Sequence, residues 1–194
     1  MNHDVTDPDT GLTGRLLVAS PALSTSEFAQ TVIYICAHSR EDGAMGLIVN
    51  KRLSQPSLDE MLTQLDITPN PPARRIGLCS GGPLDNARGF VLHSSDWSSE
   101  GSLHVDDGTV LSVGLDVLRA IAEGDGPQKA LLALGHAAWG AGQVEDEMIR
   151  GNAWLIAPAS DEILYGADHQ SKWRRALAAI DIDPLTLPDV VGHA

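Results

Sequence analysis

The order of apolar and polar positions along the chain predicts strands and helices in alternation. Short apolar runs rich in β-branched residues, bounded by Pro, Gly or polar residues, are typical of strands. On this pattern we expect strands at residues 15–20, 31–37, 44–51, 76–80, 89–93, 103–105, 109–113, 129–134 and 153–157. Apolar residues at helical spacing predict helices at residues 57–65, 114–123, 143–150 and 170–180, and a short helical turn from Ser24 to Gln30.

Several of these strands follow one another directly, so the predicted sheet is mixed rather than purely parallel. The strand at residues 129–134 is apolar at nearly every position, which predicts helices on both faces of the sheet. The fold class is therefore α/β, with α+β character, in one domain over residues 14–194. Residues 1–13 are predicted to form a flexible tail, and the Pro-containing segment 66–75 is too short to mark a domain boundary.

Composition narrows the class of protein. The chain has 194 residues with 43% hydrophobic and 20% charged side chains, which is typical of a globular protein. No apolar run reaches the roughly 18 residues of a membrane span, and the acidic N-terminus does not resemble a secretory signal. We therefore expect a cytoplasmic protein without membrane contact.

The formal charge of −13 makes direct binding to nucleic acid unfavourable, because a negative field repels a phosphate backbone. The small basic groups at residues 74–75 and 172–175 are interpreted as local counter-charges. Cys36 and Cys79 have no metal-ligand spacing and are expected to be buried thiols in a reducing compartment.

Three glycine-containing segments are candidates for a binding crevice. In residues 134–145 the predicted strand ends in glycines, and a helix then begins with acidic residues, an arrangement that often borders a crevice in α/β proteins. Glycines also punctuate residues 43–50 and 81–88, where they serve equally well in tight turns and close packing. The candidate pocket residues are Gly43, Gly46, Asn50, Gly81, Gly82, Arg88, His93, Trp139, Gly140, Gln143 and Glu145.

No motif identifies a reaction or a cofactor. The acidic start of the helix at residues 143–150 would repel phosphate, and no P-loop or nucleophile elbow is present. His104 and Asp106 share a strand face, but they do not form a recognised metal motif, so we expect no metal and no cofactor. An enzyme, such as a hydrolase, remains an alternative if His38 or His93 lies beside a thiol or a carboxylate such as Glu145.

The ordered segments resemble the YqgE/AlgH family of bacterial proteins, whose members are mostly uncharacterised. The resemblance covers roughly residues 14–194 and rests on segments 14–21, 32–38, 43–51, 81–84, 88–93, 139–145, 152–155 and 192–194. Ala37 stands where the family usually has an acidic residue and His136 where it has a tyrosine, and Cys79 lies outside the pattern. The resemblance implies one α/β domain and a regulator label, but no established activity.

These observations predict a protein that binds a small molecule or a protein partner in a crevice formed by the glycine-rich segments. The alternatives are an enzyme and a transcriptional regulator that acts through protein contacts. The ligand, any catalytic residues and the oligomeric state stay open at this point.

Overall fold

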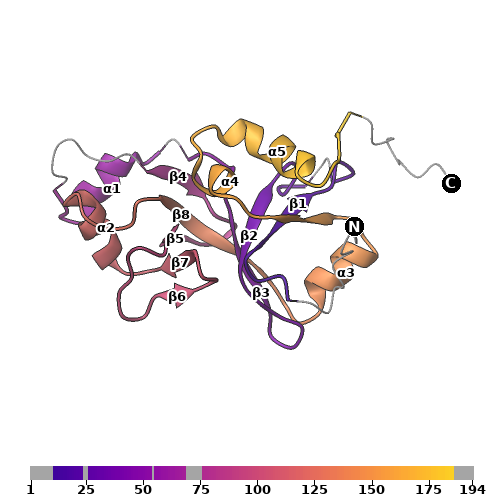
Figure 1. Ribbon diagram of the computed structural model, residues 1–194, viewed down its shortest axis with the longest axis horizontal. Coiled ribbons are helices and arrows are strands. Elements are labelled where there is room, and N and C mark those ends of the chain that lie inside the picture. Colours follow the sequence, from indigo (N-terminus) through magenta and orange to yellow (C-terminus); the bar gives the residue numbers. More distant parts are fainter. Residues whose placement is uncertain (1–10, 24–25, 54, 69–75, 186–194) are drawn as a thin grey trace.

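A computed structural model of the chain describes residues 11–23, 26–53, 55–68 and 76–185 (Figure 1). In this part of the chain the strands form one curled sheet in the order β6-β7-β5-β8-β3-β2-β1-β9, and β4 also pairs with β8. The strands are β1 Arg15–Ala19, β2 Val32–Ser39, β3 Gly43–Ile48, β4 Gly77–Ser80, β5 Leu84–Ser94, β6 Leu103–His104, β7 Thr109–Ser112, β8 Ala130–Trp139 and β9 Trp154–Pro158. The helices are α1 Leu58–Gln64, α2 Leu115–Ala122, α3 Gln143–Ile149, α4 Asp161–Tyr165 and α5 Lys172–Ala178, with a 3₁₀ turn at His169–Ser171 before α5.

The long strand β8 joins the two halves of the sheet. Its first half pairs with β5 on one edge and, in parallel, with β4 on the other, whereas its last residues pair with β3. All the other pairings given for the described strands are antiparallel, so the sheet is mixed, as the sequence predicts. Gly135 lies where β8 passes from one set of partners to the other, and its φ of +79° suits glycine.

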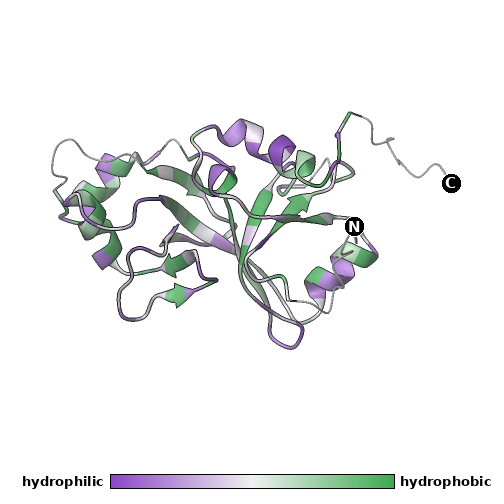
Figure 2. Cartoon of the chain, in the orientation of Figure 1, coloured by the Kyte–Doolittle hydropathy of each residue, from purple (hydrophilic) through white to green (hydrophobic). Residues whose placement is uncertain are grey.

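Helices cover both faces of the sheet, which confirms the predicted fold class. Apolar residues of α4 and α5, such as Ile163 and Leu177, pack on one face in a cluster that spans both halves of the sheet. On the other face, Val144 of α3 packs on the half that contains β1–β3, and α1 and α2 pack on the half that contains β5. The hydropathy colours of Figure 2 show the same layering, with apolar strands between amphipathic helices.

Local sequence signals account for most of the element boundaries. Ser57 caps α1 and forms the predicted capping box with Glu60. The hairpin of β2 and β3 forms around the polar turn before Gly43, and the predicted helices at residues 114–123 and 143–150 correspond to α2 and α3.

The prediction was wrong where β8 ends. The strand continues through Gly135 and His136 to Trp139, because glycine at this point allows the β4–β5 connection to approach the backbone without breaking the strand. The prediction also missed α4 and the first residues of β5. Residues 26–30 form turns rather than a helical segment, and Ser24, residues 1–10 and residues 186–194 lie outside the described residues.

Candidate functional site

The structure distributes the predicted site residues between different parts of the sheet. At one end, Gly43 of β3 lies against the end of β8, where an added Cβ would come within 2.0 Å of the Trp139 carbonyl oxygen. Its φ of +93° also favours glycine. Gly43, Trp139 and Gly140 are therefore brought together, and their close backbone contact joins the β2–β3 hairpin to β8.

The side chains of α3 hold that helix against the sheet. The Glu147 carboxylate accepts hydrogen bonds from the indole nitrogens of Trp139 at 2.8 Å and Trp154 at 3.1 Å. The Gln143 side chain accepts from the Gly140 backbone N–H at 2.9 Å. Buried indole N–H groups need partners, so these polar residues have a structural task in docking α3.

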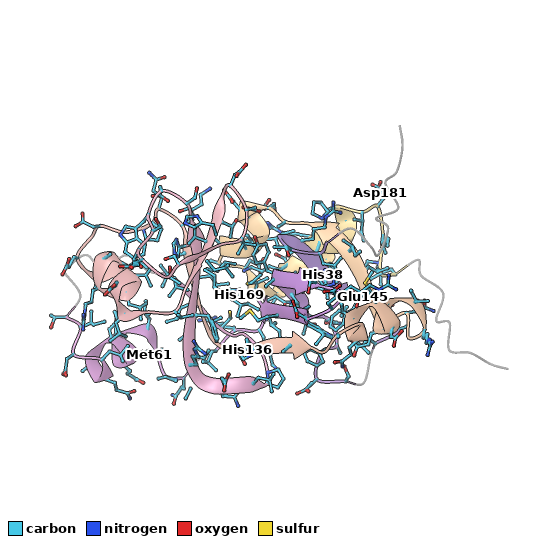
Figure 3. All side chains as sticks on the ribbon, turned by 90° about the horizontal axis from the view of Figure 1, so that it is seen from below. His38, Met61, His136, Glu145, His169 and Asp181 are labelled. Carbon is cyan, nitrogen blue, oxygen red and sulfur yellow. The ribbon has the colours of Figure 1, made fainter. Side chains whose placement is uncertain are left out.

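Glu145 and His38 form a buried pair on the same side of the molecule, and Figure 3 shows them side by side. The His38 Nε2 atom lies 2.6 Å from the Glu145 carboxylate, and the two side chains are 3% and 7% exposed. The Leu12 backbone N–H donates to the other ring nitrogen, Nδ1, at 3.0 Å. Nε2 therefore carries the proton that it donates to Glu145, and Nδ1 has no free lone pair with which to act as a base.

This geometry bears on the enzyme alternative. A histidine within about 3 Å of a carboxylate is the arrangement that alternative requires, but both ring nitrogens of His38 are occupied and the ring is almost fully buried. Because the pair ties the N-terminal segment, β2 and α3 together, we assign it to stability. The second oxygen of Glu145, Oε2, is buried without a hydrogen-bond partner.

The other glycines of the prediction lie deep in the sheet. A Cβ on Gly82 would come within 2.1 Å of the His136 carbonyl carbon, and one on Gly81 would come within 2.3 Å of the Gly135 carbonyl oxygen. Gly46 lies under the side chain of Ile33, where a Cβ would approach to 2.7 Å. These positions exclude side chains because strands and connections pass very close to one another.

The structure does not bring the remaining predicted site residues together, since each has contacts of its own: they are Asn50, Arg88 and His93. Asn50 accepts from the Val32 N–H at 2.9 Å and donates to the Gln30 carbonyl at 2.8 Å, so it joins the end of β3 to the turn before β2. Arg88 is exposed, with its guanidinium 5.3 Å from the centre of the Phe90 ring.

His93 is fully buried. Its Nδ1 donates to the Ser94 carbonyl oxygen at 2.9 Å, so Nε2 accepts from the Ser112 hydroxyl at 2.8 Å. Burial lowers the pKa of His93, and the hydrogen bond to Ser94 opposes that change. Its ring contacts the Trp97 ring edge-on. The structure thus gives His93 the contacts of a neutral core residue.

A polar hollow lies where the end of β3 meets the β4–β5 connection, and we call it the Lys51 hollow. Its volume is about 500 Å³. Its polar lining comes from Lys51 and Gln55 after β3, Ser80 at the end of β4, Asn86 in β5 and Glu27 in the turn before β2. Gly82, Ile48 and Leu134 complete the inner wall. A second hollow of about 400 Å³, which contains Asn50, shares Glu27 and Lys51 with it.

Residues of segments 43–50 and 81–88 therefore line the Lys51 hollow, and Leu134 is the one residue of segment 134–145 among its lining residues, whereas Trp139, Gln143 and Glu145 do not line it. Glu27, Phe28 and Gln55 were not among the predicted site residues. No local pattern marks them, because they come from a turn and a connection that only the folded sheet brings beside Gly82.

A metal site, a reactive thiol and a membrane span each have requirements against which the described residues can be compared. No group of three or more His, Cys, Asp or Glu residues among them could hold a metal ion. Cys36 and Cys79 are unpaired and buried, and burial raises the pKa of each thiol to about 12, which leaves little nucleophilic thiolate at neutral pH. In the part of the chain that the structure describes, no helix has the length and hydropathy to cross a membrane.

The basic residues at positions 172–175 do not all face solvent. Lys172 is 1% exposed, and Arg175 forms an ion pair with Glu162. Arg74 and Arg75 lie outside the described residues.

The fold and these contacts define a single-domain α/β protein built on a curled mixed sheet. Comparison with known proteins identifies the particular family: residues 16–185 match the model of a family described as AlgH-like. The chain belongs to this family, as its resemblance to YqgE/AlgH proteins predicts.

Two relatives illustrate the similarity. The chain is 62% identical over 186 residues to a UPF0301 protein of Gluconobacter oxydans, covering 96% of this chain and 100% of that protein. It is 45% identical over 183 residues to a UPF0301 protein of Rhodospirillum rubrum, covering 94% of each. Neither of these names states an activity.

Solved structures share the fold. The solution structure of the AlgH protein from Pseudomonas aeruginosa is similar with a TM-score of 0.75 and 39% identity over 100% of both chains. A crystal structure of a Corynebacterium diphtheriae protein is similar with a TM-score of 0.63 over 84% of this chain and 81% of that one. Its 24% identity supports the fold alone.

Proposed function

We propose that this protein binds a small molecule in the Lys51 hollow. The observation that carries the proposal is the meeting of two glycine-containing segments at a hollow of about 500 Å³ lined by convergent polar groups. Pockets of roughly 300–1,000 Å³ with a few well-placed polar groups are typical of small-molecule sites. The close backbone packing at Gly82 gives the hollow a rigid wall.

The polar lining suits recognition rather than chemistry. Lys51 supplies a cation, Ser80 a hydroxyl, and Asn86 and Gln55 amides that both donate and accept hydrogen bonds. Among its described lining residues the hollow has no histidine or cysteine, and no hydrogen bond joins the Ser80 hydroxyl to Lys51 or Glu27, so no activated nucleophile is assembled there. We therefore favour a binding protein over an enzyme, within a reducing, cytoplasmic setting that the two buried thiols suit.

A regulatory role would follow from binding if the ligand changed a contact with a protein partner. The hollow lies between the turn before β2 and the β4–β5 connection, two segments whose relative position a ligand would fix. We propose such a role only as a consequence of ligand binding, and direct nucleic-acid binding is disfavoured by the charge of −13.

A thermal-shift screen of the purified protein against a panel of phosphorylated sugars, carboxylic acids, amino acids and nucleotides tests the proposal. A ligand that binds only the folded state raises the melting temperature, and the rise grows with the ligand concentration relative to its dissociation constant. The expected result is a stabilising compound whose effect is lost in Ser80→Phe, which fills the hollow, and reduced in Lys51→Gln. Lys129→Gln, which changes a surface lysine outside the hollow, should leave the effect unchanged.

The outcome that contradicts the proposal is equally specific. If a compound stabilises the wild type and the Ser80→Phe variant equally, its site lies elsewhere. If no compound in the panel stabilises the protein, and NMR spectra show no shifts around Ser80 and Asn86 with the same panel, the hollow is not a small-molecule site.

A further inference from the structure

An apolar groove adjoins the Lys51 hollow at Leu134. Its volume is about 290 Å³, and its walls come from α1 and α2 over β5 and β8. Met61 and Leu65 form one side, Leu115 and Leu118 the other, and Val91 and Leu132 the floor. Figure 1 shows α1 and α2 together at the end of the molecule away from α3, and in Figure 3 Met61 likewise lies away from His38 and Glu145.

The mouth of this groove leaves large apolar side chains in contact with solvent. Val113 is 48% exposed and Leu115 is 39% exposed, although both line the groove. Neighbouring exposed apolar residues around a concave surface mark ligand or partner sites more often than isolated ones do. Gln64 is the polar side chain among the described residues that line the groove, so its interior offers no partner for a charged group.

The groove and the Lys51 hollow meet at Leu134, which lines both. Leu132 and Leu134 alternate with Ala133 along β8 and so point to the same face of the sheet. On β5, Asn86 lines the hollow and its neighbour Ala87 lines the groove. A polar compartment and an apolar compartment thus lie next to each other, with the Leu134 side chain between them.

We propose that the ligand is a single-chain anionic amphiphile, with its acidic head beside Lys51 in the hollow and its aliphatic tail in the groove between α1 and α2. This inference rests on the proposed function, whose hollow it assigns to the head. Lys51 is the cation among the described lining residues, which favours a carboxylate or a similar anion on its side of the hollow. Glu27 lines both the Lys51 hollow and the second hollow, so its carboxylate would repel the head and direct it to the Lys51 side.

The tail explains features that a polar ligand does not. An aliphatic chain in the groove would cover Val113 and Leu115, and would contact Met61, whose unbranched side chain adapts to varied apolar shapes. Burial of each additional methylene should tighten binding about fourfold. The affinity should therefore rise with chain length until the groove is filled.

Isothermal titration of the full-length protein with hexanoate, octanoate and decanoate, below their critical micelle concentrations, tests the inference. The expected result is one binding site whose dissociation constant falls about fourfold for each added methylene. Leu115→Ser should weaken decanoate binding roughly tenfold, whereas Leu103→Ser, which changes a similarly exposed leucine on β6, should not. Leu134→Trp should weaken binding by obstructing the junction.

The head is tested with decan-1-ol and with Lys51→Gln. Decanoate should bind the wild type about tenfold more tightly than the alcohol, and Lys51→Gln should remove that preference while Lys129→Gln keeps it. The inference is overturned if decanoate does not bind, if affinity is independent of chain length, if Leu115→Ser and Leu103→Ser behave alike, or if acid and alcohol bind equally. Failure of decanoate together with a polar ligand that binds at Ser80 would reject the amphiphile and leave the proposed function standing.

Discussion

Lys172 offers a direct test of how the buried interior is organised. Its ammonium group donates hydrogen bonds to the carbonyl oxygens of Val49 at 2.9 Å and Leu164 at 3.3 Å, and the residue is 1% exposed. Among the described residues no carboxylate forms an ion pair with it. Burial lowers the pKa of Lys172 to about 8, against a smaller opposing effect from the Cys79 thiol.

The sign of the pH dependence follows from this pKa. The unfolded chain holds the lysine proton up to its ordinary pKa of 10.5, whereas the folded protein releases it near pH 8. Between these values the unfolded state binds more protons, so the contribution of Lys172 to the free energy of unfolding rises with pH. The full difference between the two pKa values corresponds to about 3 kcal/mol, of which about 1.4 kcal/mol is recovered between about pH 7 and pH 9.

The buried thiols act in the opposite direction over the same interval. The pKa of Cys36 and that of Cys79 are each raised from 9.0 to about 12, so the unfolded state loses thiol protons first as the pH rises. Together they remove about 0.8 kcal/mol between about pH 7 and pH 9. The free energy of unfolding of the wild type would therefore change only slightly with pH. The contribution of Lys172 has to be obtained as the difference between the wild type and a variant without this lysine.

Denaturant unfolding of the wild type and Lys172→Met at about pH 7, 8 and 9 provides that difference. Methionine keeps the length and volume of the side chain but does not titrate, so the thiol contributions largely cancel. The free energy of unfolding of the wild type should gain about 1.4 kcal/mol relative to the variant from about pH 7 to pH 9. The Lys172 ¹³Cε resonance should titrate near pH 8. A difference that stays constant with pH, or a resonance that titrates near the ordinary lysine value, would refute the reasoning.

Three further predictions concern the contacts described above. Glu147→Ala leaves two buried indole N–H groups without an acceptor and should lower the free energy of unfolding by about 3 kcal/mol, whereas the exposed Glu162→Ala should cost less than about 1 kcal/mol in the same denaturation assay. Gly82→Ala should cost roughly 3 kcal/mol or more, because an added Cβ would collide with the His136 backbone. Gly101→Ala, also at a positive φ (+86°, against +153° for Gly82) but in open space, should cost only about 1 kcal/mol, and equal losses would mean that close packing at Gly82 is unimportant. The pKa of His93 is lowered in the folded protein, so the stability of the wild type relative to His93→Gln should be highest above about pH 6.5 and decline as the pH falls below it, as urea titrations at several pH values would show.

Much of the fold was predictable because its signals are local. The alternation of apolar and polar residues, the capping box at Ser57 and the polar turns define most strands and helices before any long-range contact is known. The apolar character of the strand that begins at Ala130 also correctly indicates that it is covered on both faces. Gly135 is an exception, because its sequence context predicts a turn, whereas the residue lies inside β8.

The candidate site was less accessible to prediction. The sequence shows where glycines cluster, and at Gly43 and Gly82 close backbone contact accounts for the glycine without any ligand. The acidic residues that open α3 suggest a functional surface, but Glu145 and Glu147 point inward to His38 and to two tryptophans. A sequence pattern cannot distinguish these cases, because both produce glycines and charged residues beside a strand end.

The sequence by itself determined the class of fold, the acidic character and the family, since periodicity, net charge and ordered motifs are properties of the linear chain. Only the tertiary structure decided which residues meet: it placed Glu27 and Gln55 beside Gly82, and set the polar hollow and the apolar groove on either side of Leu134. It also buried Lys172, with no counter-ion among the residues that the structure describes. The physical reason is that strand order and register, which bring distant segments together, depend on the packing of the whole sheet and are not encoded in any one of its segments.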